Sequence, residues 1–340
     1  MFNEFKNIFI IAEAGVNHNG DVNLAKKLID AAKQAGADCV KFQTWITDEI
    51  IDISAPKADY QKFNDGEDTS QYEMLKRLEL TFDEFAGLKR YAEQTGILFL
   101  STPDEKSSLD FLAERLKLPI LKIGSGEVNN FLFLKQVAHK KTPVILSTGM
   151  SDLADVEKAY YLLLEYGCPE VALLHCTSEY PAPYDSVNLK AIQTLQNTFK
   201  TTVGYSDHTE GFEISIAAVA MGAKIIEKHF TLDKTLPGPD HKASINPVEL
   251  KQMVGSIRNV EQAMGDGVKK PHLKEVETKK VVQKGLYASR DLKRGDIILT
   301  DDLVGKRPVI FVSIDQADHF IGKQLSRDLK RGMPLSLNDI

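Results

Sequence analysis

The stretch "TVGYSDHTEGFEISIAAVAMGAKIIEKHF" (residues 202–230) contains two apolar runs of strand type, and each run stops at a histidine. The runs cover 202–208 and 224–230, and an alanine-rich segment that ends near Gly222 separates them. A strand, a helix and a second strand in this order are the unit of a parallel sheet. The stretch therefore predicts one such unit, and it leaves open whether His208 and His229 are packed side chains or two parts of one site.

Eight runs of this kind occur along the chain, each followed by a helical pattern. They cover 8–15, 39–44, 97–102, 120–125, 144–148, 171–177, 202–208 and 224–230. In the first helical segment, Asp21 can cap the start and Gly36 can close the end. Eight repeated units over roughly 250 residues favour a (β/α)8 TIM barrel over a doubly wound open sheet. The long polar connection over 45–72 predicts a lid or a substrate loop.

The strand–helix pattern stops at a charged segment that contains Gly265, Gly267 and Pro271. We therefore expect a barrel domain over 1–264, a partly helical linker over 265–284 and a small β-rich unit over 285–340. In this last unit the sequence "RDLKRG" occurs twice, at 290–295 and at 327–332, which predicts two related halves with solvated basic turns. A unit this short has only marginal stability by itself, and we expect it to pack against another surface.

Composition excludes several classes of protein. Hydrophobic residues make up 43% of the chain and charged residues 26%, which is ordinary for a soluble globular protein. The net charge of -6 gives no general reason to expect nucleic acid binding, and no apolar run has the length of a membrane span. The first residues lack the features of a signal peptide. The three cysteines fit buried thiols in a reducing cytoplasm, so we expect a cytoplasmic protein.

Polar side chains occupy the C-terminal end of every predicted strand, where a TIM barrel carries its catalytic groups. These positions hold Glu13, Lys41, Gln43, Ser101, Thr102, Lys122, Ser125, Glu127, Ser147, Thr148, Thr177, Ser178, Ser206, His208 and His229. A polar edge that meets solvent explains any one of them. Eight such strand ends together favour a site.

The residue types at these ends point to three kinds of chemistry. Hydroxyls together with lysine predict an anion site of phosphate type, formed by Thr102, Lys122, Ser125, Ser147, Ser178 and Ser206. Neutral imidazoles of His208 and His229 can hold a divalent metal, and Mn²⁺ or Mg²⁺ suits an oxygen-rich site better than structural zinc. Spacing alone leaves two packed histidines as the alternative. Glu13 can act as a general base or stabilise developing positive charge.

Nine motifs carry a resemblance to a known family. They are "IAEAGVNHNGD" (11–21), "VKFQT" (40–44), "FLSTP" (99–103), "KIGSGE" (122–127), "ILSTGM" (145–150), "LLHCTSEYPAP" (173–183), "GYSDHT" (204–209), "IEKHFTLD" (226–233) and "PGPDHKAS" (237–244). With them the chain resembles the bacterial sialic acid synthases, a group of nonulosonic acid synthases, over nearly its whole length. Its tail resembles the antifreeze-like (SAF) domain of these enzymes.

The resemblance implies a role for each matching residue. It implies a divalent metal, Mn²⁺ before Mg²⁺ or Co²⁺, on His208 and His229, and central chemistry at Glu13. It implies phosphoenolpyruvate binding by Lys41, Thr102, Lys122, Ser125, Ser147, Ser178 and Ser206. It implies sugar binding by Gln43, Glu127, Tyr180 and Asp240, and by Arg307, which in a domain-swapped homodimer reaches the partner subunit.

The resemblance also implies a reaction, the metal-dependent condensation of phosphoenolpyruvate with an N-acylated mannosamine-type sugar. The expected products are a nine-carbon 2-keto acid and phosphate. The segment over 57–80 and the motifs near 180 and 240 favour the legionaminate synthase branch, which uses 2,4-diacetamido-2,4,6-trideoxymannose, before N-acetylneuraminate synthases and then pseudaminate synthases. Two departures stand out, because "VIFVS" follows Pro308 and Asp104 stands where an aromatic residue is common in the family. A pyruvyl aldolase and a carbohydrate- or ice-binding protein stay as alternatives from other classes.

Overall fold

Eight parallel strands form the centre of the N-terminal part of the chain in the computed structural model, which describes residues 1–2, 5–55 and 70–340. The strands are β1 Phe9–Gly15, β2 Cys39–Thr44, β3 Leu98–Pro103, β4 Leu121–Ile123, β5 Val144–Ser147, β6 Val171–Cys176, β7 Val203–Asp207 and β8 Ile225–His229. Strands that follow one another in the chain lie side by side, and β1 pairs with β8. Strands β3 and β4 lie next to each other and complete the ring. The predicted TIM barrel is confirmed.

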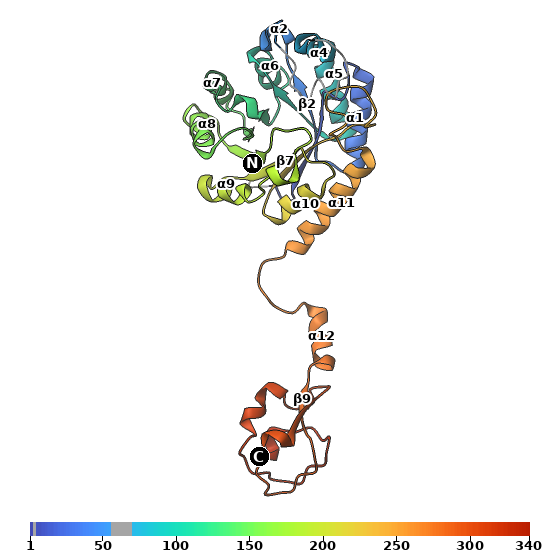
Figure 1. Ribbon diagram of the computed structural model, residues 1–340, viewed down its shortest axis with the longest axis vertical. Helices are drawn as coiled ribbons and strands as arrows, with labels where there is room; N and C mark the ends of the chain where they lie inside the picture. The colour runs from blue at the N-terminus through green and yellow to red at the C-terminus, as the bar shows by residue number, and fades with distance from the viewer. Residues whose placement is uncertain (3–4, 56–69) are drawn as a thin grey trace. The chain divides into compact units, whose positions relative to one another are not determined.

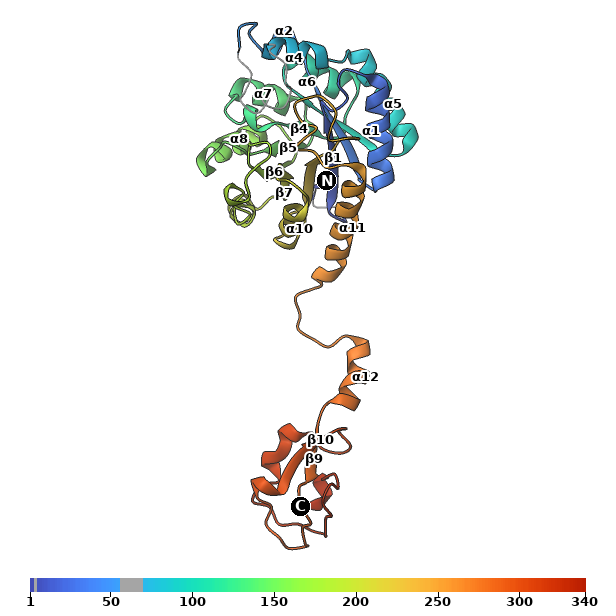
Figure 2. The same ribbon diagram turned by 45° about the vertical axis from the view of Figure 1, so that its right-hand side comes forward.

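Helices surround this ring of strands (Figures 1 and 2). The longer ones are α1 Val22–Ala35, α5 Phe82–Thr95, α7 Phe131–His139, α8 Leu153–Glu165, α9 Ala191–Phe199, α10 Glu213–Ala220 and α11 Pro247–Met264. The shorter ones are α2 Thr47–Ile50, α4 Gln71–Leu78 and α6 Lys106–Asp110, and a π-helical turn over Phe111–Arg115 follows α6. The ends of α1 form as predicted, because the Asp21 side chain accepts a hydrogen bond from the Asn23 N–H and Gly36 closes the helix in the left-handed conformation.

The inner face of the barrel changes from apolar to polar along each strand. Side chains two residues apart point to the same face of a strand. The lower part of the barrel interior is therefore filled by apolar residues, among them Ile11, Leu100 and Ile225. Two residues further along, the same faces carry Glu13, Thr102 and Glu227, which are all buried. The alternation thus places buried polar groups together at the C-terminal end of the barrel.

The long connection between β2 and β3 contains α2 and α4, and the Ser70 side chain caps α4 by accepting a hydrogen bond from the Glu73 N–H. Most of the predicted lid or substrate loop falls on residues 56–69, which lie outside the described residues. Its predicted role stays a prediction.

The chain divides into two compact units, Met1–Gly265 and Asp266–Ile340. The second unit contains α12 Leu273–Val282 and the antiparallel strands β9 Gly285–Ala288 and β10 Leu303–Lys306. It has its own hydrophobic core, which includes Leu286, Phe320 and Leu335. Both strands lie within 285–340, where we expect the small β-rich unit, and α12 lies within the expected linker over 265–284.

The repeated sequence of the second unit forms two turns that brace each other. Leu292 and Leu329, which hold equivalent positions in the two copies, form an antiparallel bridge. Lys293 Nζ lies 2.9 Å from Asp328 Oδ2, and Lys330 Nζ lies 2.9 Å from Asp291 Oδ2. These reciprocal contacts join the two copies of the repeat in the same way from each side, as expected for two related halves.

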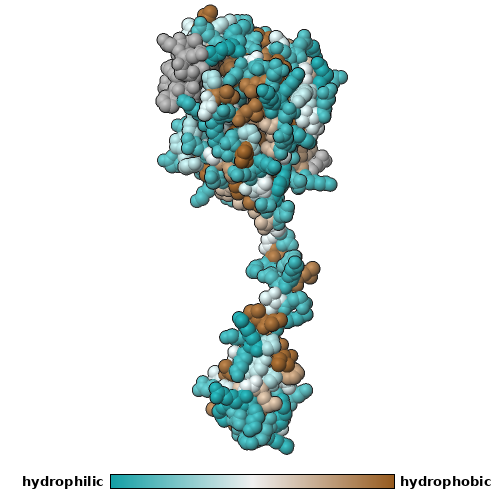
Figure 3. Space-filling view, turned by 90° about the vertical axis from the view of Figure 1, so that its right-hand side faces the viewer, coloured by the Kyte–Doolittle hydropathy of each residue, from teal (hydrophilic) through white to brown (hydrophobic). Residues whose placement is uncertain are grey.

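Apolar side chains remain exposed on α12 and on the segment before it, as the brown atoms there show (Figure 3). Leu273 keeps 83% of its surface exposed and Val281 keeps 66%, and α12 has no buried residue. Within the ranges that the structure describes, no helix combines the length and apolar character that a membrane crossing requires.

Candidate active site

A cavity of about 330 Å³ opens at the C-terminal ends of the barrel strands. Its lining residues are Glu13, Lys41, Gln43, Thr102, Asp104, Lys122, Gly124, Ser125, Gly126, Ser147, Met150, Cys176, Ser178, Tyr180, Ser206, His208, Glu227 and His229. All eight strands or the turns that follow them contribute. The structure thus brings together all the residues that we expected around phosphoenolpyruvate, both histidines, Glu13, Gln43 and Tyr180.

Three expected sugar contacts lie elsewhere. Asp240 lines a smaller cavity that shares Gln43, Tyr180 and His229 with the first. Glu127 lies in the turn after β4, where its carboxylate accepts a hydrogen bond from the Asn130 side chain, and it is absent from the described lining of both cavities. Arg307 belongs to the second unit, where it is exposed and precedes a cis peptide bond to Pro308.

Two lysines and two carboxylates alternate across the floor of the cavity of about 330 Å³. Lys41 Nζ lies 2.8 Å from Glu13 Oε2 and donates to Thr102 Oγ1 at 3.1 Å. Lys122 Nζ donates to Ser147 Oγ at 2.8 Å. Glu227 lies between the lysines, with Nζ atoms 3.5 Å and 3.8 Å from its carboxylate oxygens. This arrangement keeps two ammonium groups buried and beside hydroxyls, as a site for a phosphate or carboxylate requires.

The two carboxylates of this floor have opposite pKa shifts. Burial raises the pKa of Glu13, and the charge of Glu227 adds to that rise, although Lys41 opposes it. Burial also pushes the pKa of Glu227 upward, but Lys122 and Lys41 outweigh it, so that the pKa of Glu227 lies below its ordinary value. Glu227 therefore stays ionised, whereas Glu13 can exchange a proton near neutral pH.

The serine side of the cavity depends on a close backbone approach. Ser125 Oγ accepts a hydrogen bond from the Gly149 N–H at 2.9 Å. A Cβ atom on Gly149 would lie 2.3 Å from Ser178 Oγ and 3.0 Å from Ser125 Oγ, so a side chain at this position would displace both hydroxyls. Glycine after Thr148 thus allows the turn after β5 to lie against the two serines.

The two histidines face each other with ring centroids 5.6 Å apart. His208 Nδ1 lies 2.6 Å from the Thr177 carbonyl oxygen and donates to it, which leaves Nε2 as the acceptor nitrogen. Burial lowers the pKa of His208 to about 4 and that of His229 well below its ordinary value, so both imidazoles are neutral. Neutral imidazole is the form that binds metals.

The residues present fit a divalent metal. His229 Nδ1 is buried, has no hydrogen-bond partner among the described residues, and lies 3.6 Å from Asp240 Oδ2. Burial raises the pKa of Asp240 to about 6. No group of three or more His, Cys, Asp or Glu side chains within 1–2, 5–55 and 70–340 is arranged to hold a metal. A metal here would have two protein nitrogens and would need oxygen ligands from elsewhere.

The loop that carries Asp240 is fastened to the loop after β1. The buried His241 ring bonds Thr231 Oγ1 at 2.7 Å and Asn19 Oδ1 at 3.1 Å. Ser244 Oγ donates to the Asp240 carbonyl oxygen at 2.6 Å and accepts from the Asn17 side chain at 2.9 Å. These contacts fix the backbone on both sides of Asp240 and so hold its carboxyl near His229.

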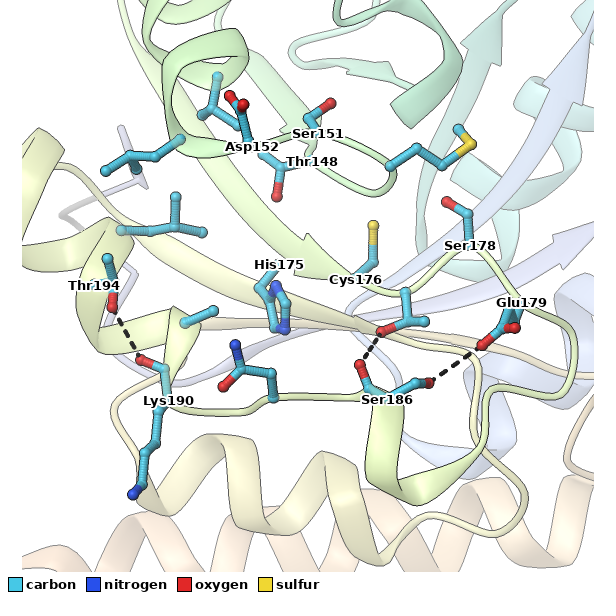
Figure 4. Close-up of a pocket in the computed structure, with 17 residues that line it drawn as sticks. Thr148, Ser151, Asp152, His175, Cys176, Ser178, Glu179, Ser186, Lys190 and Thr194 are labelled. Atoms are coloured by element: carbon cyan, nitrogen blue, oxygen red, sulfur yellow. Dashed lines mark hydrogen bonds between the residues drawn. The ribbon is translucent and has the colours of Figure 1, made fainter.

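A third cavity of about 710 Å³ lies between the start of α8, strand β6 and helix α9 (Figure 4). Cys176 and Ser178 line it as well as the active-site cavity. His175 points toward it on the outer side of β6, and His175 Nε2 lies 2.6 Å from the Val187 carbonyl oxygen. Neither Lys41 nor Lys122 lines this third cavity. The anion-binding groups therefore identify the cavity of about 330 Å³ as the candidate active site.

Comparisons with known protein families identify the class of protein to which this fold and this site belong. Residues 28–269 match the NeuB family and residues 283–340 match the SAF domain. The chain belongs to the NeuB family.

Individual relatives with known names show which members of the family the chain is similar to. The chain is 48% identical to the N,N'-diacetyllegionaminic acid synthase of Campylobacter jejuni, over 96% of this chain and 98% of that one. It is also 48% identical to the N,N'-diacetyllegionaminic acid synthase of Legionella pneumophila, over 96% and 93%. The solved N-acetylneuraminic acid synthetase of Leptospira borgpetersenii is 36% identical and matches 80% of this chain and 90% of its own with a TM-score of 0.71.

Glu227 is the residue of the cavity floor that sequence reasoning missed. It lies in "IIEKHF" (225–230), where Lys228 and His229 follow it, and the sequence singles out His229 as the polar end of the strand without giving Glu227 a role of its own. The one available signal is its spacing, because it precedes His229 by two residues and therefore points to the same face of the strand. Asp104, noted in the sequence only as an unusual residue, also lines the cavity.

Proposed function

We propose that the chain condenses phosphoenolpyruvate with the open-chain form of an N-acylated mannosamine-type sugar, giving a nine-carbon 2-keto acid and phosphate. The observation that carries this proposal is the alternation of Lys41 and Lys122 with Glu13 and Glu227 beside two neutral imidazoles. It combines an anion site, an ionisable carboxyl with a raised pKa and a pair of metal ligands in one cavity.

The chain's own residues account for the binding of phosphoenolpyruvate. The two ammonium groups and the hydroxyls of Thr102, Ser147 and Ser206 would neutralise and orient its phosphate and carboxylate. Ser125 and Ser178 would complete the site from the side of Gly149. His208 and His229 would hold a divalent cation, which we propose to be Mn²⁺ rather than Mg²⁺ or Co²⁺, and which when bound would polarise the sugar carbonyl.

The bond changes balance without a further reactant except water. C3 of phosphoenolpyruvate forms a bond to the aldehyde carbon, whose oxygen takes up a proton. Water adds to the positively charged C2, and Glu13 would accept the proton that this water loses. The C2–O bond to phosphate then breaks, and the departing phosphate takes the proton of the C2 hydroxyl, which leaves the ketone of the product and inorganic phosphate.

The sugar is proposed to be 2,4-diacetamido-2,4,6-trideoxymannose, with N-acetylmannosamine as the second candidate. The 48% identity to two legionaminic acid synthases supports the first candidate. Gln43, Tyr180 and Asp240 would contact the sugar. Glu127 is not among the described lining residues of either cavity, so it would contact only a part of the sugar that extends beyond them. We place the reaction in the cytoplasm, where the three buried cysteines stay reduced.

We further propose a domain-swapped homodimer in which Arg307 binds the sugar in the site of the partner subunit. The exposed apolar residues on and before α12 support this, because apolar side chains such as Leu273 gain from burial against a second copy.

A panel of N-acyl mannosamines, each with phosphoenolpyruvate and Mn²⁺, tests the proposed function. We expect phosphate release only when sugar, phosphoenolpyruvate and metal are all present, with 2,4-diacetamido-2,4,6-trideoxymannose giving the highest kcat/KM. Phosphate release that needs no sugar, or none with any sugar, would reject the proposal. Pyruvate in place of phosphoenolpyruvate should give no product, because turnover with pyruvate would indicate an aldolase.

A further inference from the structure

A small cavity of about 100 Å³ extends the candidate active site on the side of Asp240. Gln43, Tyr180 and His229 line both cavities and form the polar wall between them. The other described lining residues are Asp240 and the apolar Val16, Met74, Leu75, Leu78 and Pro239. A group that enters it from the active site therefore meets hydrogen-bonding atoms first and hydrocarbon behind them.

The apolar wall is a packed surface. Val16, Met74 and Leu78 have exposed fractions of 5%, 1% and 2%, and they form one hydrophobic cluster with Trp45. Met74 and Leu78 lie four residues apart in α4, so they share one face of that helix. Such a wall has little freedom to rearrange around a group of the wrong polarity.

The chemistry of this wall selects against hydroxyl groups. A hydroxyl that leaves water for an apolar surface loses hydrogen bonds that Val16, Met74 and Leu78 cannot replace. A methyl group of the same size gains from the same transfer. The cavity volume leaves room for a small substituent of the sugar.

We propose that this cavity receives a methyl group of the sugar substrate, and that Val16, Met74 and Leu78 determine specificity for sugars that carry it. The inference rests on the proposed function, whose sugar has two kinds of methyl group. One is C6 of a 6-deoxy sugar, and the other is the methyl of an acetamido group. Both offer the same apolar chemistry to the wall, and the experiment separates them.

Two matched pairs of acceptors provide the test, with kcat/KM followed by phosphate release. The first pair is 2,4-diacetamido-2,4,6-trideoxymannose and its 6-hydroxy analogue, and the second is N-acetylmannosamine and N-glycolylmannosamine. The hydroxylated member of one pair should be used about 10- to 100-fold less well, which is the range in which an apolar pocket rejects an added hydroxyl. The pair that is discriminated identifies the methyl group.

Variants of the wall make the assignment specific. Val16→Thr replaces one methyl by a hydroxyl at nearly constant shape, and Met74→Gln places an amide in the same wall. Both should reduce the preference to within a few-fold of unity, while the KM for phosphoenolpyruvate stays unchanged. Ile50→Thr is the matched control, because Ile50 packs on the same cluster but is not in the described lining. It should keep the wild-type preference.

Equal use of both members in both pairs would overturn the inference and leave the proposed function intact. Full wild-type preference in Val16→Thr and Met74→Gln would also overturn it. If no sugar supports phosphate release in the wild-type protein, the proposed function fails first and the inference fails with it.

Discussion

At the scale of single residues, the buried ion pair of Glu13 and Lys41 is the main feature of the site. Their side chains are 1% and 3% exposed. Burial raises the pKa of Glu13 from 4.5 to about 7, and the nearby charge of Glu227 contributes, against the opposing effect of Lys41. A carboxyl with such a pKa is suited to accept a proton at neutral pH. Its neighbour Glu227 keeps its charge and balances the lysines.

The raised pKa of Glu13 predicts the pH dependence of the reaction. As a base, Glu13 must be ionised, so kcat/KM should fall as the pH drops below about 7. Glu13→Gln removes the ionisable group and should lower kcat by about 10²- to 10⁴-fold. The fall of kcat/KM on the acidic side should disappear in this variant. An unchanged pH profile in Glu13→Gln would show that another group accepts the proton.

The Nδ1 of His229 is buried and has no hydrogen-bond partner among the residues that the structure describes, and this predicts what happens when the side chain is removed. His229→Ala should abolish Mn²⁺ binding in a calorimetric titration and lower turnover by at least about 10³-fold. Phosphoenolpyruvate should still bind, because Lys41 and Lys122 remain. His175→Ala serves as the control, since His175 lies on the outer side of β6. Near-normal activity of His229→Ala would contradict the metal assignment.

At the scale of elements, strands β7 and β8 are joined by a buried ion pair on their outer side. Lys228 Nζ lies 3.2 Å from Asp207 Oδ2, and both side chains are fully buried. Lys228 also donates to the Thr209 carbonyl oxygen at 2.6 Å, and Asp207 accepts from the Ser215 hydroxyl at 2.6 Å. The pair thus fixes the turn that follows His208.

The cost of breaking this pair can be measured. Lys228→Met leaves the Asp207 carboxylate buried without its cation and should destabilise the protein by about 3–5 kcal/mol. The double variant Lys228→Met with Asp207→Asn removes both charges and should recover much of that loss. Denaturation in urea at pH 7.5 measures both values, with Lys224→Met as a control on the surface. Equal stability of the single and double variants would contradict the account.

The strands were predictable because each is a short β-branched run that a turn or a helical pattern follows. The predicted run 224–230 and the observed strand Ile225–His229 differ by one residue at each end. The site was predictable where a polar residue ends a strand, as with His208. Glu227 escaped because it stands in a polar end of the strand, Glu227-Lys228-His229, where only His229 suggested a ligand, and because its role depends on lysines that other strands contribute. The position of Glu127 depends on the turn after β4, which periodicity does not determine.

At the scale of the whole molecule, we propose that Arg307 serves the sugar site of the partner subunit. The proposed sugar site includes the barrel residues Gln43, Tyr180 and Asp240. The described lining of the cavity of about 100 Å³ that they share contains no lysine or arginine. An arginine from the SAF domain would supply a fork of donors for an acyl carbonyl oxygen or for sugar hydroxyls. In a domain-swapped dimer this arginine comes from the partner subunit.

Complementation between two inactive variants tests this arrangement. Arg307→Ala should raise the KM of the sugar and lower kcat, with little effect on the KM of phosphoenolpyruvate. When it is unfolded and refolded together with His229→Ala, mixed dimers combine an intact barrel with an intact Arg307 from the other chain. Activity should therefore return in the mixture, while each variant refolded alone stays impaired. No recovery would show that Arg307 does not act across subunits.

We propose that phosphate leaves phosphoenolpyruvate from C2 after the sugar has been attached. Phosphoenolpyruvate labelled with ¹⁸O at the oxygen that bridges C2 and phosphorus tests it most directly, with the wild-type protein, Mn²⁺ and 2,4-diacetamido-2,4,6-trideoxymannose. We expect the label to leave with inorganic phosphate, and a product with the mass of the nine-carbon acid to form in equal amount. Label that remains in a keto product, or labelled phosphate without any sugar adduct, would contradict it.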